Sequence, residues 1–301
     1  MRQIPRLLLG IAMMAVLLVS LAFIAFRLVD PTSGTLSSSG DTRRYLLYVP
    51  GSYDGTHPVP LVISIHGFAQ WPAHQAMLTH WNEVADEEGF IVVYPEGTGF
   101  PRRWRAGTGD AVSGAQVDVA FLADLIDTLA REYAIDPARV YVNGMSNGAG
   151  MTFALSCTLA ERIAAMGLVA GAYLYPEEAC APARPVPAIV FHGTDDPIVP
   201  FGGGPSRSFD RPFPDISRFV ASLAERNGCS DGAVPSACTP NLSRTEYQGC
   251  EADVVYYTIH GGGHTWAGGQ GIPAWIGGTT NEDIDATRAM WAFFSDHPRE
   301  P

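Results

Sequence analysis

The chain has 301 residues, of which 47% are hydrophobic and 17% charged, and its formal net charge is −12. This composition is that of a folded chain rather than a disordered one, and the length suits a single α/β domain with a large core. Because so acidic a protein is not built to neutralise phosphates, the charge argues against nucleic-acid binding.

Residues 1–29 have the pattern of an export segment. Leu7–Phe26 carries no charge and follows Arg2 and Arg6. At a helical rise of about 1.5 Å per residue, this run spans roughly 30 Å, the thickness of a bilayer core. A cleaved signal peptide and an uncleaved membrane anchor both fit. Either one predicts that the rest of the chain lies outside the cytoplasm, in the cell envelope or the extracellular space.

Residues 30–40 are rich in Ser and Gly, which predicts a linker, and residues 41–301 then form one domain. Short β-type runs alternate with amphipathic stretches in this domain. That pattern predicts an α/β fold with a mostly parallel sheet, covered by helices on both faces. The predicted strands are Arg44–Val49, Leu61–His66, Phe90–Tyr94, Val140–Asn143, Ala165–Val169, Ala188–His192 and Val254–Ile259. The predicted helices are Trp81–Glu88, Val117–Tyr133, Asn147–Ala160, Ile216–Asn227 and Ile284–Ser295.

Two long loops remain between these elements, at Pro95–Gln116 and Phe201–Asp215. Loops of that length in an α/β protein tend to border a functional site. We therefore expect both to lie near the site.

The five cysteines are Cys157, Cys180, Cys229, Cys238 and Cys250. An exported compartment permits disulfides, and an odd number leaves at least one thiol over. Spacing does not fix the pairing. We expect Cys157–Cys180 and Cys229–Cys250 with Cys238 unpaired, and a fully reduced set is the alternative. No cysteine or histidine spacing indicates a metal site, and no cofactor is expected.

Gly144-Met-Ser146-Asn-Gly148 follows a β-type run and precedes a helix-compatible run. Gly-x-Ser-x-Gly alone is a weak signal, but this strand–turn–helix context is that of a nucleophile elbow. The turn is sharp, and the flanking glycines keep it free of Cβ clashes. Ser146 is therefore the candidate nucleophile.

A serine nucleophile needs a base, and the base needs an orienting carboxylate. In α/β hydrolases the acid and then the histidine follow the serine in the chain. Asp195 and Asp196 come directly after the strand Ala188–His192, and either could be the acid. His264 follows three glycines after the last predicted strand, so it is the candidate base.

The oxyanion of the tetrahedral intermediate needs two N–H donors. One is expected from Asn147, the residue after the nucleophile, and the other from the loop after Leu61–His66. Phe68 is our choice in that loop. His66 and His192, which precede glycines at strand ends, are interpreted as structural.

Together, five motifs resemble the polyhydroxybutyrate depolymerase/feruloyl esterase family of α/β hydrolases, which has acetyl-xylan esterase relatives. They are His66-Gly-Phe-Ala-Gln70, Tyr94-Pro-Glu-Gly97, Gly144-Met-Ser-Asn-Gly148, His192-Gly-Thr-Asp-Asp-Pro-Ile-Val199 and Gly261-Gly-Gly-His-Thr-Trp266. The resemblance covers about residues 44–297. It implies a triad of Ser146, Asp196 and His264, and it favours Asp196 over Asp195 as the acid.

Two positions depart from the family pattern. Cys is common after His-Gly, where this chain has Phe68, so a disulfide at the oxyanion loop is lost and the loop lacks that source of rigidity. Proline is common after the tryptophan, where this chain has Ala267, and we expect little effect from that change.

The sequence thus predicts an exported serine esterase whose catalytic domain is residues 41–301. Its partner is an ester substrate, either a feruloyl or acetyl ester of plant polysaccharide or a short hydroxyalkanoate polyester. A membrane partner follows if residues 1–29 stay attached. Aromatic side chains in the loops offer stacking faces, and Trp104, Trp266 and Phe201 are expected to bind substrate. The alternatives are a catalytically silent membrane-tethered binding protein and a thioesterase or amidase of the same fold.

Overall fold

The computed structural model describes residues 14, 32–106, 111–206, 211–271 and 273–300. The predicted export segment, residues 1–29, lies outside the described residues except for Met14. Within the described part of the chain, no helix is both long enough and apolar enough to span a bilayer.

The centre of the fold is a ten-stranded sheet in the order β1-β2-β4-β3-β5-β6-β7-β10-β9-β8. The strands are β1 Gly34–Ser38, β2 Asp41–Tyr48, β3 Val59–Ile65, β4 Ile91–Pro95, β5 Ile135–Met145, β6 Ala165–Val169, β7 Ala188–Gly193, β8 Ala233–Thr239, β9 Leu242–Tyr247 and β10 Val254–Ile259. The run from β4 to β10 is parallel, whereas β1, β2, β8 and β9 pair antiparallel at the two ends.

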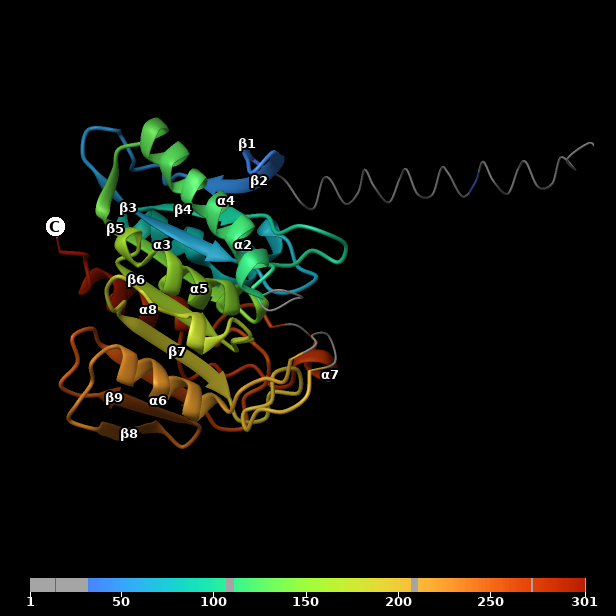
Figure 1. Ribbon diagram of the computed structural model, residues 1–301, viewed down its shortest axis with the longest axis vertical. Helices are drawn as coiled ribbons and strands as arrows, with labels where there is room; N and C mark the ends of the chain where they lie inside the picture. Colours follow the sequence, from blue (N-terminus) through green and yellow to red (C-terminus); the bar gives the residue numbers. More distant parts are fainter. Residues whose placement is uncertain (1–13, 15–31, 107–110, 207–210, 272, 301) are drawn as a thin grey trace, which may run out of the picture.

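Helices cover both faces of this sheet (Figure 1). They are α2 Pro72–Thr79, α3 Trp81–Glu88, α4 Ala111–Glu132, α5 Asn147–Thr158, α6 Ile216–Arg226, α7 Ala274–Gly277 and α8 Ala286–Ser295, with short 3-10 turns η1 Ala160–Arg162 and η2 Glu177–Ala179. Side chains of α4, α5 and α6 join one hydrophobic core, and side chains of α2, α3 and α8 join the other. The predicted fold class is confirmed.

The two cores arise from the alternation of side chains along each strand. Leu61 and Ile63 of β3 enter the core beneath α4 and α5, whereas Val62 between them enters the core beneath α3 and α8. Strands β4, β6 and β7 are buried along their whole length, as expected for parallel strands covered on both sides. Each central strand is therefore held from two directions, which gives the loops at its end a rigid base.

All seven predicted strands and all five predicted helices are present. In Figure 1 the arrows of β3 and β7 point toward the side of the molecule where α7 lies, so the carboxyl ends of the parallel strands share one edge. The loops that carry Phe68, Ser146, Asp196 and His264 leave β3, β5, β7 and β10 at that edge. The fold thus brings the candidate residues to one side of the molecule.

The predicted linker, residues 30–40, is wrong over Gly34–Ser38. This stretch forms β1, which pairs antiparallel with β2 from Gly34↔Tyr45 to Ser38↔Asp41. Its Ser and Gly content matched a linker, but a short edge strand needs few apolar side chains because one long side of it faces solvent. The folded domain therefore begins before residue 41.

Other elements were not predicted. β8 and β9 form a hairpin at the far end of the sheet, and α2 and α7 lie in segments for which no helix was predicted. α4 begins at Ala111, so the end of the predicted loop Pro95–Gln116 is helical. Most of β8 is exposed, so its sequence carries no run of apolar residues to reveal it.

Both expected disulfides are present. Cys157–Cys180 links the end of α5 to the segment after η2, and Cys229–Cys250 links the end of α6 to the segment after β9. Cys238 on β8 is a free, exposed thiol. The two bridges fit an oxidising compartment.

Candidate active site

Ser146 occupies the tight turn between β5 and α5. Its backbone has φ 57° and ψ −122°, a conformation that residues with a Cβ rarely adopt. The turn is held by hydrogen bonds from Ser146 N to the Val169 carbonyl at 2.9 Å and from Ala172 N to the Ser146 carbonyl at 3.0 Å. The side chain makes no capping hydrogen bond to α5, although Ser146 stands at its N-cap. The hydroxyl is thus half-buried and not used to cap the helix.

Asn147 begins α5, and its backbone N–H belongs to the first turn, where amides lack helical partners. The positive end of the helix dipole therefore favours negative charge beside Ser146. The Asn147 side chain is fully buried. Its Oδ1 accepts from Trp104 N at 2.7 Å, and its Nδ2 donates to the Trp104 carbonyl at 3.1 Å. This amide pair fixes the start of α5 against the loop before α4.

The oxyanion loop, His66–Gln70, follows β3. A Cβ on Gly67 would lie 3.4 Å from the Ser146 Cβ, so this loop runs directly beside the candidate nucleophile. Gly67 N–H donates to Gln70 Oε1 at 2.8 Å, and Ala69 N–H donates to the Arg102 carbonyl at 2.8 Å. Phe68 lies between these two anchored residues. Hydrogen bonds on both sides of Phe68 thus hold this loop in place, although it lacks the disulfide that is common in the family.

His66 is a structural anchor of the same loop, as predicted. Gly97 N–H donates to His66 Nε2 at 2.9 Å, so the ring proton is on Nδ1, which donates to the Gly67 carbonyl at 2.7 Å. Burial lowers the pKa of His66 to about 4. The imidazole is therefore neutral and fully engaged, which makes it unsuitable as a catalytic base.

Asp196 and His264 form a buried hydrogen-bonded pair, with 2.8 Å between Asp196 Oδ2 and His264 Nδ1. The other carboxylate oxygen accepts from the backbone N–H groups of Ile198 and Val199, both at 2.8 Å. Since Nδ1 faces the carboxylate, Nε2 is the ring nitrogen left to accept a proton. The carboxylate of Asp195 instead accepts from Thr194 Oγ1 at an exposed position, so of the two it is Asp196 that contacts His264.

The loops that hold this pair are tied to each other and to α7. Asp195 N–H donates to the Gly262 carbonyl at 2.9 Å, and Gly263 N–H donates to the Thr279 carbonyl at 2.8 Å. A Cβ on Gly263 would lie 2.0 Å from the carbonyl oxygen of Gly277, the last residue of α7, so this position requires glycine. Close backbone approach therefore explains the glycine directly before His264, whereas Gly261 has a positive φ of 69°.

His192 lies on the other side of Asp196. Its Nε2 is 3.0 Å from the Val199 carbonyl and 3.5 Å from Asp196 Oδ2, and the ring is buried. Burial lowers the pKa of His192, although the nearby carboxylate opposes that shift. The neutral ring supports the loop that carries Asp196, in agreement with its structural interpretation.

Two of the three predicted substrate-binding residues do not offer a ring to solvent. Trp104 and Trp266 are both 0% exposed. Trp104 Nε1 donates to the His66 carbonyl at 2.9 Å, and Trp266 Nε1 donates to Thr287 Oγ1 at 2.9 Å. The loops that carry them fold inward over the sheet edge, so the predicted stacking role is wrong for both. Phe201 is half-buried, with its ring 6.2 Å from that of His192, and its substrate role stays a prediction.

Trp104 and Gln70 are residues whose importance the sequence analysis missed. The Trp104 side chain donates to the His66 carbonyl and its backbone bonds the Asn147 side chain, so this one residue joins the oxyanion loop to the elbow. Gln70 holds Gly67 from within the loop. Gln70 belongs to the motif His66–Gln70, and its spacing of three residues from Gly67 was the sequence feature that could have indicated this contact. Trp104 had none, since its role depends on the path of a long loop.

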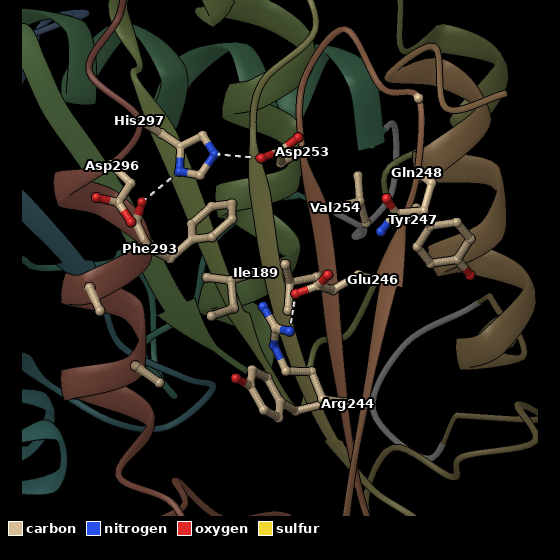
Figure 2. A pocket seen from close by; sticks show the side chains of 15 residues that line it. Ile189, Arg244, Glu246, Tyr247, Gln248, Asp253, Val254, Phe293, Asp296 and His297 are labelled. Atoms are coloured by element: carbon tan, nitrogen blue, oxygen red, sulfur yellow. Dashed lines mark hydrogen bonds and ion pairs between the residues drawn. The ribbon is translucent and has the colours of Figure 1, made fainter. Parts of the chain in front are cut away.

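A separate pocket of about 480 Å³ lies between α8 and the strands β9 and β10 (Figure 2). Several of its charged groups pair with one another. His297 Nε2 contacts Asp253 at 3.0 Å, and Arg244 contacts Glu246 (Figure 2). None of the described residues that line it is Ser, Thr or Cys. It therefore offers no serine, threonine or cysteine side chain comparable to Ser146 at the carboxyl edge of the sheet.

Among the residues that the structure describes, no group of three or more His, Cys, Asp or Glu side chains is arranged to hold a metal ion. The carboxyl edge of the sheet presents a serine hydroxyl, a buried Asp–His pair and the backbone N–H groups at the start of α5.

Comparison with known proteins decides the family. Residues 43–199, more than half of the chain, match the family described as esterase PHB depolymerase. The chain belongs to this family. The resemblance inferred from the five motifs is thereby confirmed.

Curated relatives and solved structures agree with this assignment. The chain is 30% identical over 215 residues to a bifunctional acetylxylan esterase/xylanase of Neocallimastix patriciarum, covering 68% of this chain and 29% of the relative. It is 30% identical over 241 residues to feruloyl esterase B of Piromyces equi, covering 77% and 44%. The chain thus spans less than half the length of these two relatives. An acetyl xylan esterase from Aspergillus awamori shares the fold, with TM-score 0.58, 16% identity, and 77% and 93% of the two chains covered.

Proposed function

We propose that this protein is a serine esterase in which Ser146, His264 and Asp196 form the catalytic triad. Ser146 Oγ attacks the ester carbonyl while His264 Nε2 takes the hydroxyl proton and then gives it to the leaving alcohol. Asp196 holds the imidazole in the required tautomer and stabilises its cation. Water then cleaves the acyl-enzyme by the same route, with His264 again acting as the base.

The observation that carries this proposal is the buried Asp196–His264 hydrogen bond of 2.8 Å. This pair lies at the same sheet edge as Ser146. The strained backbone of Ser146, and a hydroxyl that makes no capping hydrogen bond to α5, suit a nucleophile. The Asp196 carboxylate accepts two backbone N–H bonds on one oxygen and contacts His264 Nδ1 with the other, so its orientation is fixed. We propose that His264 Nε2, the ring nitrogen left over, acts as the base for Ser146.

The developing oxyanion is proposed to accept hydrogen bonds from the backbone N–H groups of Phe68 and Asn147. The first belongs to a loop anchored on either side by Gly67 and Ala69, and the second to the first turn of α5. Preorganised donors of this kind lower the barrier because they do not need to reorient as charge develops.

The proposed substrates are carboxylic esters, namely feruloyl or acetyl esters of plant polysaccharide, or short hydroxyalkanoate polyesters. The relatives named feruloyl esterase and acetylxylan esterase support the first group, and the family description supports the second. The two disulfides support export of the domain. Attachment to a membrane through residues 1–29 depends on whether they are cleaved, which sequencing of the mature N-terminus tests.

The proposal is tested by measuring release of product from methyl ferulate, acetylated xylan and hydroxybutyrate oligomers. The wild-type protein should hydrolyse at least one of them. Ser146→Ala should reduce turnover by about 10⁴-fold or more, because triad members act as a unit.

Two neighbouring histidines supply a matched comparison. His264→Ala should cause a loss of similar size, whereas His260→Ala should leave turnover near wild type, because His260 is exposed and contacts Ser243 at 2.7 Å. Hydrolysis that survives in Ser146→Ala or His264→Ala would refute the triad. If no ester is hydrolysed but thioesters or amides are, the alternative of a thioesterase or amidase of the same fold would be favoured.

A further inference from the structure

A second pocket, of about 740 Å³, borders the oxyanion loop. Its wall includes Ala69 and Gln70 of that loop, Thr42–Arg44 of β2 and the segment Glu96–Arg102. The volume falls within the roughly 300–1,000 Å³ that is usual for small-molecule sites. Nothing in the proposed triad uses this space. As an extension of the proposed function, this pocket belongs to the substrate that reacts at Ser146.

The pocket is coupled to the candidate nucleophile through short steps along the backbone. Gly67 lies beside the Ser146 Cβ, and Ala69 and Gln70, two and three residues further along the chain, line the pocket. Ala69 N–H is bonded to the Arg102 carbonyl, so the two walls are joined at 2.8 Å. A substrate that places its ester at Ser146 and extends past Phe68 therefore reaches this pocket.

The pocket carries an excess of positive charge. Its wall has three guanidinium groups, Arg43, Arg44 and Arg102, but a single carboxylate, Glu96. Arg43 is buried and paired with Asp118 at 3.0 Å. Glu96 lies 3.3 Å from Arg102 but 4.0 Å from Arg44, so it is shared between two cations and sits closer to Arg102.

Arg44 is the cation best placed to receive an anion. Its side chain is 20% exposed, and among the described residues its one carboxylate partner is the distant Glu96. Its Nη2 donates to Thr32 Oγ1 at 2.8 Å, which orients the planar group and leaves other N–H donors for a ligand. This positive site stands out in a chain of net charge −12 that contains no lysine.

The rim of the pocket is aromatic. Phe100 is 98% exposed, the highest value among the large hydrophobic side chains that the structure describes, and Trp71 and Pro101 line the same space. Exposed aromatic faces beside a polar site mark ligand-binding surfaces, and they suit the apolar face of a sugar ring.

We propose that this pocket binds a carboxylate-bearing sugar ring, a uronic acid, in the polysaccharide to which the ester is attached. Arg44 receives the carboxylate through charge-assisted hydrogen bonds, and Phe100 contacts the ring face. The protein is then selective for esters on acidic rather than neutral polysaccharide. The preference comes from the pocket and not from the triad.

The test is calorimetric titration of the wild-type protein with two oligosaccharides that carry no ester, a glucuronic-acid-substituted xylotetraose and plain xylotetraose. The acidic sugar should bind about tenfold more tightly, because hydrogen bonds between charged groups contribute on that scale. Arg44→Gln should remove this difference. Phe100→Ala, at an exposed position that cannot disturb the core, should weaken binding of both sugars.

Arg162→Gln is the matched control, since Arg162 is a surface arginine that pairs with Asp127 and does not line the pocket. It should bind both sugars as the wild type does. Equal affinity for the two sugars, or a preference that persists in Arg44→Gln protein with a wild-type melting temperature, would overturn the proposal. Because neither sugar contains an ester, this outcome is independent of whether Ser146 is catalytic.

Discussion

The glycines on either side of Ser146 are required by close contacts between backbones. A Cβ at Gly148 would lie 2.2 Å from the Ile65 carbonyl oxygen and 2.6 Å from that of His66. These backbone atoms belong to the end of β3 and the start of the oxyanion loop, so moving them would distort the sheet and the loop. The elbow and the oxyanion loop are therefore packed directly against each other.

Gly148→Ala should lower the free energy of unfolding by about 1–3 kcal/mol, the usual cost of overpacking, and should also reduce esterase turnover by displacing Phe68. Gly51→Ala is the matched control, because its added Cβ meets nothing within 4 Å. Urea denaturation of both variants measures the difference. Equal stability of the two variants would show that the elbow tolerates a side chain and that the close approach is not required.

His66 should make the fold sensitive to acid. Burial lowers its pKa to about 4 from an ordinary 6.5, so the unfolded chain binds this proton more readily than the folded one. The contribution of neutral His66 to the free energy of unfolding is then complete above pH 6.5. It is lost as the pH falls from 6.5 toward 4, which lowers the free energy of unfolding by about 3 kcal/mol.

His66→Gln should be less stable than wild type at neutral pH but should lose less stability between pH 6.5 and 4. Denaturant unfolding at several pH values measures this slope. His57→Gln, which alters an exposed loop histidine, should keep the wild-type slope because His66 is retained. An unchanged slope in His66→Gln would mean that other groups control the acid response.

At the residue scale, sequence reasoning succeeded where a motif fixes local geometry. The Gly-x-Ser-x-Gly motif predicted the tight turn that holds Ser146, and the family resemblance selected Asp196, the carboxylate that contacts His264 at 2.8 Å. It failed for Trp104 and Trp266, whose burial depends on how two loops fold over the sheet edge. Loop composition shows that an aromatic ring is available but not which way it faces.

At the scale of elements, a buried ion pair anchors the loop between β4 and α4. Arg43 of β2 contacts Asp118 of α4 at 3.0 Å, and the second oxygen of Asp118 accepts from Arg105 N at 2.8 Å. Burial lowers the pKa of Arg43, which the nearby Asp118 opposes. One carboxylate thus links a strand, a helix and the loop that carries Trp104.

Asp118→Ala should lower the free energy of unfolding by about 3–5 kcal/mol, because it leaves Arg43 charged and unpaired in the interior. Glu87→Ala provides the contrast. Glu87 pairs with Arg288, but their side chains are 50% and 51% exposed, so the loss of stability should be much smaller than in Asp118→Ala. Chemical denaturation distinguishes the two, and a similar small loss in both would show that the buried pair is not an anchor.

The two edge strands that the sequence did not predict share a physical cause. They are β1 and β8, and in both of them solvent-exposed side chains break up any apolar run: two of five residues are exposed in β1 and six of seven in β8. Such strands are defined by backbone pairing with β2 and β9, their neighbours along the chain, and not by runs of apolar residues. Central strands were predicted because burial on both faces demands runs of Val, Ile and Leu.

At the scale of the whole molecule, the two disulfides close loops with sequence separations of 23 and 21 residues. Loops of this size constrain the unfolded chain, so each bridge should stabilise the fold by about 2–4 kcal/mol. Replacing both cysteines of either pair by Ala should lower the melting temperature. Replacing Cys238, the free thiol, should leave the melting temperature unchanged, and an equal loss there would contradict the assignment.

We propose that catalysis depends on Ser146 and His264 acting together at the edge that β5 and β10 share with β7. Labelling with a fluorophosphonate probe, followed by peptide mapping, measures the reactivity of the serine without any choice of substrate. The wild-type protein should carry the adduct on Ser146, and labelling should be slowed by orders of magnitude in His264→Ala and Asp196→Asn but not in His260→Ala. An adduct on another residue, or equal labelling rates in all four proteins, would contradict a triad at this edge.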